Sequence, residues 1–165
     1  MVPTTILGAR SAPYTEPREK HAKYALGTKT VAFSPHLLLE QSDALTFTEG
    51  EEITLMNWGN AIVRSISHSL NPLHLNRVTS LELELHLQGD VKKTKKKVTW
   101  LSKDQELVPV KLVVYDHLVT KDKLGPEDEL KDILNPKTEE WTEAVADCNV
   151  VELRENDVMQ FDRKG

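Results

Sequence analysis

The residues with the clearest chemical meaning are five lysines within six positions, Lys92-Lys93-Thr94-Lys95-Lys96-Lys97. Lysine binds phosphate groups as a point charge and gains free energy when counterions are released. The chain as a whole is acidic, with 21 Lys and Arg against 26 Asp and Glu, so any positive surface is local. We therefore predict phosphate contacts from Lys92, Lys93, Lys95, Lys96 and Lys97. The alternative is a solvated loop that prevents aggregation.

A second group of basic side chains lies near the N-terminus. It consists of Arg18, Lys20, His21 and Lys23. Tyr14 and Tyr24 flank this stretch, and an aromatic ring beside positive charge is typical of surfaces that bind single-stranded nucleic acid. These four residues are predicted to contact phosphates, and the two clusters together favour RNA as the ligand.

Residues for catalysis or metal binding do not form a recognisable pattern. The six histidines, at positions 21, 36, 68, 74, 86 and 117, lack the spacing and the cysteine partners of metal sites. Cys148 stands alone, which excludes an internal disulfide and favours a packing role in a reducing compartment. Glu51-Glu52 is interpreted as a solvated pair. We predict no catalytic residue, no metal site and no cofactor in this chain.

The elements that must position the basic residues look like short β-strands. Leucine occupies every second position of Leu81–Leu87, so this strand has one buried and one solvated face. Gly89-Asp90 ends it, and Val98–Leu101 is interpreted as the returning strand. The sequence thus predicts a hairpin with the lysine run at its tip.

The rest of the chain is interpreted as further short strands, about ten in all at roughly 8–12-residue intervals, which is typical of a barrel or sandwich. They include Val108–Val119, Trp141–Val145, Val150–Leu153 and Val158–Phe161. A short helix is predicted over Pro126–Leu134. Residues 1–28 carry three prolines and little apolar periodicity, so an extended lead-in segment is expected there. No run of about 20 apolar residues and no signal peptide is visible, which predicts a soluble, intracellular protein with no membrane partner.

Several blocks of the sequence resemble the anticodon-binding domain of class I glutamyl- and glutaminyl-tRNA synthetases. They include residues 20–31, 37–44, 51–61, 96–102 and 110–118, in the order of that family. The resemblance implies a mainly β fold: two small six-stranded-type barrels, proximal and distal, with exchanged strands and one or two short helices, within residues 29–165. Trp58 and Trp100 are expected in the core.

The family resemblance also suggests which side chains read the anticodon. The glutaminyl branch usually has arginine at the positions of Gln41 and His117, and both departures favour the glutamyl branch. The Trp58-Gly59-Asn60 block and the lysine run look like the eukaryotic cytosolic glutamyl form. Base contacts are accordingly predicted for Gln41, Lys111 and His117.

The catalytic signatures of class I synthetases are absent from this sequence. The resemblance therefore implies a tRNA-binding fragment of a cytoplasmic glutamate–tRNA ligase, whose partners are the anticodon stem-loop of tRNA-Glu and a catalytic domain that uses ATP and Mg. Two alternatives are a β-barrel that docks onto a multi-synthetase complex, and the equivalent domain of a glutaminyl-tRNA synthetase.

Overall fold

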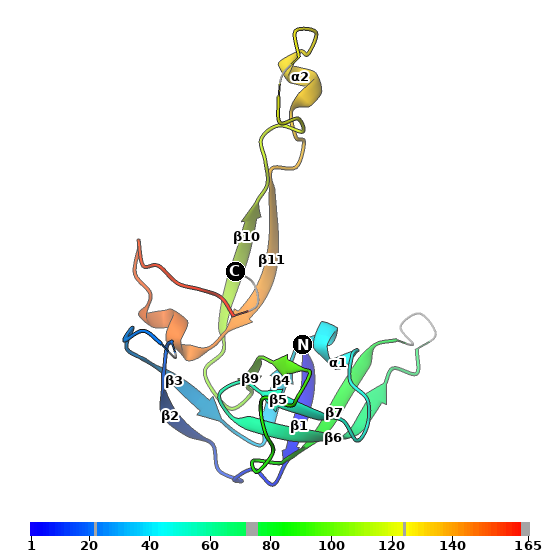
Figure 1. The fold of residues 1–165 in the computed structure, drawn as a ribbon, viewed down its shortest axis with the longest axis vertical. Coiled ribbons are helices and arrows are strands. Elements are labelled where there is room, and N and C mark those ends of the chain that lie inside the picture. The colour runs from blue at the N-terminus through cyan, green and yellow to red at the C-terminus, as the bar shows by residue number, and fades with distance from the viewer. Residues whose placement is uncertain (22, 72–75, 124, 163–165) are drawn as a thin grey trace. The chain divides into compact units, whose positions relative to one another are not determined.

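The computed structural model describes residues 1–21, 23–71, 76–123 and 125–162, and the described part is mainly β (Figure 1), as predicted. The chain divides into two compact units. The first unit contains Met1–Leu107 and Asp147–Gly165, and the second contains Val108–Ala146. The second unit is thus an insertion in the sequence of the first.

A seven-stranded sheet forms the centre of the first unit. Its strands are β1 (Val2–Leu7), β4 (His36–Leu39), β5 (Glu52–Leu55), β6 (Gly59–His68), β7 (Val78–Leu85), β8 (Lys97–Val98) and β9 (Trp100–Ser102), in the order β8-β5-β6-β7-β1-β4-β9. The pairs β1–β7 and β5–β8 are parallel, and the other four are antiparallel. Only Thr99 separates β8 from β9, so the two ends of the sheet lie next to each other and the sheet curls into a nearly closed barrel.

The barrel encloses a core made by alternating side chains. In β7, Leu81 and Leu83 are fully buried while Glu82 is exposed, as the leucine alternation predicted. Strand β1 alternates in the same way, with Val2 and Ile6 buried. This differs from the lead-in segment expected over residues 1–28. The alternation was hard to recognise in the sequence because β1 is short. Only three of its residues face the core, and one of these is the polar Thr4.

A two-stranded antiparallel sheet packs beside the barrel. It consists of β2 (Tyr14–Glu19) and β3 (Thr28–Phe33). Phe33 is fully buried, and its ring centroid lies 5.2 Å from that of Trp58 and 5.5 Å from that of Trp100. The two indoles pack against the core, as expected. The indole N–H of Trp100 donates to the carbonyl oxygen of Met56 at 2.8 Å, which ties β9 to the end of β5.

The free edge of β3 is covered by the side chain of Asn149. Its amide donates to the Thr30 carbonyl oxygen at 2.8 Å and accepts from the Thr30 N–H at 2.9 Å. Asn149 belongs to the 3-10 helix η2 (Cys148–Glu152), where a strand was predicted, so the prediction for Val150–Leu153 is wrong. The carboxylate of Asp147 accepts the Asn149 N–H and thereby favours a helical turn. Residues 158–161 form no strand.

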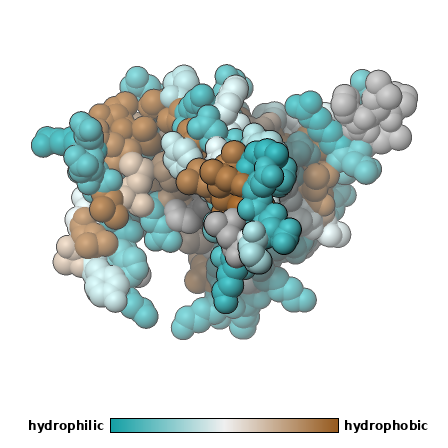
Figure 2. All heavy atoms as spheres, turned by 90° about the horizontal axis from the view of Figure 1, so that it is seen from above, coloured by the Kyte–Doolittle hydropathy of each residue, from teal (hydrophilic) through white to brown (hydrophobic). Residues whose placement is uncertain are grey.

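The second unit is an antiparallel ribbon of β10 (Val108–Tyr115) and β11 (Glu139–Ala146), with the short helix α2 (Leu130–Ile133) between them. Helix α2 covers only the end of the predicted helix. Ile133 is 2% exposed, whereas Val114, Tyr115 and Leu118 are at least 68% exposed. On the face of the molecule in Figure 2, hydrophobic residues, drawn in brown, lie at the surface among hydrophilic residues, drawn in teal.

The predicted hairpin between Leu81–Leu87 and Val98–Leu101 is wrong. Strand β7 pairs with β6 and β1, whereas β8 pairs with β5 and β9 pairs with β4. Alternation specifies which face of a strand is buried but not which strand lies beside it. None of the helices that the structure describes has the length and apolar character needed to span a membrane.

Candidate nucleic-acid interface

The lysine segment, Lys92–Lys97, lies between β7 and β8 and ends at Lys97, the first residue of β8. It starts from a hydrogen-bonded turn. The Asp90 carboxylate accepts the Lys92 N–H at 2.9 Å, and the Asp90 carbonyl oxygen accepts the Lys93 N–H at 3.0 Å. Lys92, Lys93, Lys95 and Lys97 are exposed. Four of the five predicted phosphate-binding lysines are therefore accessible to a ligand.

The remaining lysine, Lys96, is held by an acidic partner. Its ammonium group lies 2.6 Å from a carboxylate oxygen of Glu51 and also donates to the carbonyl oxygen of Thr46. The Lys96 side chain is only 28% exposed. The structure thus places Lys96 in an ion pair on the barrel, unlike its neighbours.

A chain of polar side chains fixes the lysine segment to the barrel from inside. Thr94 is buried, and its hydroxyl oxygen lies 2.5 Å from that of Thr54. The Thr54 hydroxyl donates to the Asn60 side-chain oxygen at 2.7 Å, and the Asn60 amide donates to the Glu52 carboxylate at 3.1 Å. The same carboxylate oxygen lies 2.6 Å from Nδ1 of His86. We call Glu52, Thr54, Asn60, His86 and Thr94 the Glu52 network.

The Glu52 carboxylate is kept ionised by this arrangement. Hydrogen bonds from His86, and secondly from Asn60, lower the pKa of Glu52. Gly89 allows the close packing, because a Cβ atom at this position would lie 2.1 Å from a Glu52 carboxylate oxygen and 2.6 Å from the Asn60 side-chain nitrogen. A side chain at position 89 would therefore displace the network.

The hairpin cluster, Arg18, Lys20, His21 and Lys23, lies where β2 turns into β3, and all four residues are exposed. The Arg18 guanidinium pairs with Glu16 at 2.6 Å, and the His21 ring contacts the Tyr24 ring with centroids 4.8 Å apart.

The two tyrosines near the hairpin cluster differ in exposure. Tyr14 stacks on Phe33 at 5.0 Å and is covered by Arg10. Tyr24 is 64% exposed, so Tyr24 is the ring accessible to a base.

Gln41 begins helix α1 (Gln41–Ala44), and its side chain is partly occupied by the backbone. In the amide orientation that satisfies hydrogen bonding, it donates to the Val78 carbonyl oxygen at 3.0 Å and accepts from the Val78 N–H at 2.8 Å. Both bonds are to the backbone of Val78, the first residue of β7. A base edge would have to compete with them for the Gln41 amide.

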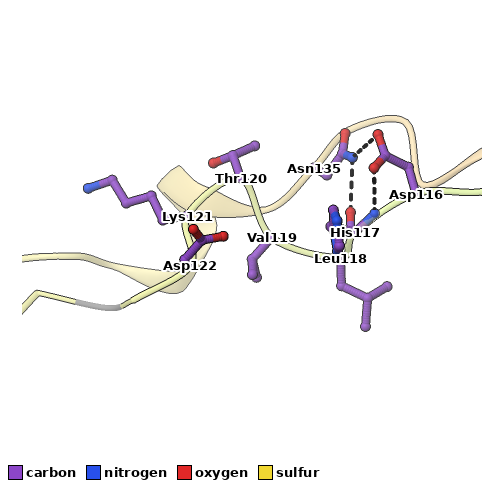
Figure 3. Close-up of a pocket in the computed structure, with 8 residues that line it drawn as sticks. All are labelled: Asp116, His117, Leu118, Val119, Thr120, Lys121, Asp122 and Asn135. Carbon is purple, nitrogen blue, oxygen red and sulfur yellow. Dashed lines mark hydrogen bonds between the residues drawn. The ribbon is translucent and has the colours of Figure 1, made fainter.

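Lys111 and His117 belong to the second unit. The Lys111 ammonium lies 4.3 Å from the ring centroid of Trp141, a diagonal cross-strand contact. His117 follows β10 and lines a hollow with Asp116 and Asn135. Figure 3 shows the Asp116 carboxylate accepting from the Asn135 amide and the His117 N–H, at 3.3 and 2.7 Å. Six residues of extended chain span about 20 Å, so Lys111 and His117 would contact different nucleotides.

Sequence reasoning missed the Glu52 network. Glu51-Glu52 was interpreted as solvated and His86 as ordinary, although the two glutamates are paired with Lys96 and His86. His74 lies outside the described residues. The sequence does contain one signal of the network. Thr94 is the one uncharged residue within a run of lysines, which indicates that this position faces inward. Cys148 is half-buried, and burial, then Asp147, raises the pKa of its thiol.

Comparison with known proteins relates almost the whole chain to one family. Two family models, both described as "tRNA synthetases class I (E and Q), anti-codon binding domain", match residues 2–86 and 97–165. The chain is 46% identical over its full length to "Probable glutamate--tRNA ligase, cytoplasmic" of Schizosaccharomyces pombe, and 42% identical over 98% of its length to "Glutamate--tRNA ligase, cytoplasmic" of Arabidopsis thaliana. It is 33% identical over its full length to "Bifunctional glutamate/proline--tRNA ligase" of Mus musculus.

The chain spans 23%, 22% and 11% of the lengths of these three relatives. Both segments that match the family contain residues singled out by the geometry: the first includes the hairpin cluster, Gln41 and most of the Glu52 network, and the second includes Lys97, Lys111 and His117. The barrel also draws strands from both segments. The chain therefore belongs to the anticodon-binding domains of the class I tRNA synthetases for glutamate and glutamine.

Proposed function

We propose that this chain binds the anticodon stem-loop of tRNA-Glu as part of a glutamate–tRNA ligase in the cytoplasm. In this proposal a catalytic domain elsewhere in the longer protein carries out glutamylation with ATP and Mg. The observation that carries the proposal is the match of both segments to anticodon-binding domains, together with relatives that are named glutamate–tRNA ligases.

The basic residues support this function by their exposure. Lys92, Lys93, Lys95 and Lys97 point to solvent from an ordered loop, and the hairpin cluster adds four more basic side chains. Phosphate contacts fix the register of a nucleic acid but do not read its sequence. Both clusters are thus proposed to hold the RNA backbone, with Tyr24 available to stack on a base.

Reading of the anticodon is proposed for Gln41, Lys111 and His117. Lys111 and His117 are exposed, and unstacked loop bases offer their edges to such side chains. Gln41 can contribute only if its amide leaves Val78. His117 is therefore the residue whose removal tests the proposed readout most directly.

The test is binding of a fluorescent tRNA-Glu anticodon stem-loop to this chain at several salt concentrations, with a tRNA-Gln stem-loop and a scrambled anticodon as competitors. We expect preference for the glutamate anticodon and affinity that falls with salt. His117→Ala should cost about 1–3 kcal/mol of that preference and leave the salt dependence unchanged. His36→Ala, which removes another exposed histidine, is the control. Equal binding of all stem-loops would contradict the assignment to glutamate.

A second candidate function is docking within an assembly of synthetases. It is favoured by the similarity to bifunctional glutamate/proline–tRNA ligases and by the exposed apolar side chains of the second unit. Under this alternative the chain would show no salt-dependent binding of any anticodon stem-loop, and the lysine segment would bind an acidic protein surface instead.

A further inference from the structure

Thr94 is the one position of the lysine segment that is buried, with 7% of its surface exposed. Its hydroxyl oxygen lies 2.5 Å from the Thr54 hydroxyl oxygen and 3.1 Å from the Val91 carbonyl oxygen. Thr54 belongs to β5 in the wall of the barrel. Thr94 therefore attaches the middle of a highly charged loop to a rigid strand.

Further contacts hold the two ends of the loop. At the start, Gly89 N–H donates to the His86 carbonyl oxygen at 3.0 Å, and the His86 ring contacts Glu52 of β5. At the end, the Lys96 ammonium is paired with Glu51, and the Lys96 carbonyl oxygen accepts the Thr54 N–H at 2.9 Å. Glu51, Glu52 and Thr54 thus hold the loop along its whole length.

Five like charges in six positions repel one another, so an unattached segment would spread over many conformations. Ordering it upon binding RNA would then oppose affinity, whereas a loop that is already ordered avoids this entropy loss. Thr94 and Lys96 face the barrel, and the exposed lysines lie before, between and after them. The inward contacts therefore determine which ammonium groups face a ligand.

We propose that Thr94 is a positioning residue for phosphate binding and that Lys96 is a second anchor of the loop. Lys92, Lys93, Lys95 and Lys97 are then the lysines that contact phosphates, and Lys96 is not. This inference rests on the proposed function, because the phosphates are those of an RNA backbone.

The first test uses Thr94→Val, which keeps the shape and the charge of the loop but removes the hydroxyl, and Thr94→Ser, which retains it. We expect Thr94→Val to weaken binding of the anticodon stem-loop about fivefold, the effect of losing one hydrogen bond of average strength. Amide exchange at Lys93 should become faster in the free protein. Thr94→Ser should bind within about twofold of the unaltered chain. Since no charged group is removed and Thr94 is buried, the weakening would reflect the positions of the neighbouring lysines.

The second test compares two adjacent lysines of equal charge. Lys95→Gln should flatten the slope of log affinity against log salt by about 0.7, or about 0.9 for a contact to the duplex stem. Lys96→Gln should leave the slope unchanged and lower the thermal unfolding temperature instead. Lys96→Arg should restore that temperature, because arginine can also pair with Glu51.

Three results would overturn these assignments. Undiminished binding by Thr94→Val, with Lys93 exchange unchanged, would show that Thr94 does not position the loop. An equal loss of slope in Lys95→Gln and Lys96→Gln would show that Lys96 is itself a phosphate contact. If the unaltered chain binds no stem-loop in a salt-dependent way, the proposed function is wrong and this inference fails with it. The first two results, in contrast, leave RNA binding intact.

Discussion

The lysine segment and the hairpin cluster are both basic but are held in different ways. Thr94 and Lys96 attach the lysine segment to β5 and to Glu51. In the hairpin cluster, Arg18 pairs with Glu16 and the His21 ring contacts the Tyr24 ring, both near neighbours in the hairpin. The Arg18 guanidinium also lies 5.8 Å from the centroid of the Phe33 ring. One basic region is therefore fixed to the barrel, and the other extends from the end of a two-stranded ribbon.

This difference shows why charge alone is a poor guide to affinity. Both regions would attract an RNA backbone by their positive charge, but the long side chains and loop of the hairpin cluster would lose more conformational freedom on binding. We therefore expect the lysine segment to contribute more to affinity than the hairpin cluster, although each supplies at least three basic groups.

The largest effect should come from neutralising each region in turn. Replacing Lys92, Lys93 and Lys95 by glutamine should flatten the log affinity against log salt slope by about 2 to 3, from three contacts. The matched variant, with Arg18, Lys20 and Lys23 replaced, removes the same charge but should lower affinity less at each salt concentration, because ordering the hairpin cluster costs more conformational entropy. Stem-loop titrations at four salt concentrations measure the affinities of both variants. Equal losses of affinity would remove the distinction between the two regions.

The second effect concerns the packing under the lysine segment. Gly89→Ala should destabilise the chain by about 1–3 kcal/mol, because the new Cβ atom would displace the Glu52 carboxylate from His86 and Asn60. Urea unfolding measures the change. Gly125→Ala is the comparison, since its Cβ atom would lie 3.3 Å from an Asp128 carboxylate oxygen, a much milder contact than those at position 89. A Gly89→Ala chain of unchanged stability would show that the network can rearrange without loss.

A smaller effect is expected where the β2–β3 hairpin contacts helix η2 within the first unit. Asn149→Ala removes both hydrogen bonds to Thr30 and should cost about 0.5–1.5 kcal/mol, since each bond is exposed to water. Amide exchange of β2 and β3 should increase while that of β7 stays constant. Asn149→Asp keeps an acceptor for the Thr30 N–H. Its stability is expected to lie between that of the unaltered chain and that of Asn149→Ala. Exchange that rises equally in β7 would contradict a local role.

The smallest effect is the pH dependence of the Glu52 network. The hydrogen bonds to His86 and Asn60 lower the pKa of Glu52 below the usual value for a glutamate, so its contribution to stability is complete above that usual value. As the pH falls through the lower pKa of the folded chain, the contribution is lost. The stability difference between the unaltered chain and Glu52→Gln should therefore be constant from pH 5 to 6 and shrink below about pH 4.5. A stability difference that grows on acidification would contradict this prediction.

Much of the barrel could be predicted from local patterns, whereas its closure could not. Leucine alternation in β7 identified the buried face correctly, because side-chain period is a property of one strand. The pairing of β8 with β5 joins residues more than 40 positions apart, and no short pattern encodes such a choice. The hairpin predicted between β7 and β8 failed for this reason.

In the candidate site, too, the residue types could be predicted from the sequence, whereas contacts between distant positions could not. The basic residues were identified because their charge is visible in the sequence, and the structure confirms that Lys92 and its three exposed neighbours are accessible. The different role of Lys96 depends on Glu51, which lies 45 positions earlier. Gln41 was assigned to base reading, whereas its present contact with Val78 crosses from a helix to a distant strand.

The link through Thr99 has a consequence for how the barrel can form. Strands β8 and β9 end the sheet on opposite sides and come from the single short segment Lys97–Ser102. A chain that stops before residue 97 would contain the other five strands of this sheet, but β5 and β4 would each expose a row of unpaired N–H and C=O groups. Such open edges invite pairing with a second chain and aggregation. The boundary between the two family matches, after residue 86 and before residue 97, is thus no boundary for folding, and residues on both sides of it must be synthesised before the barrel can close.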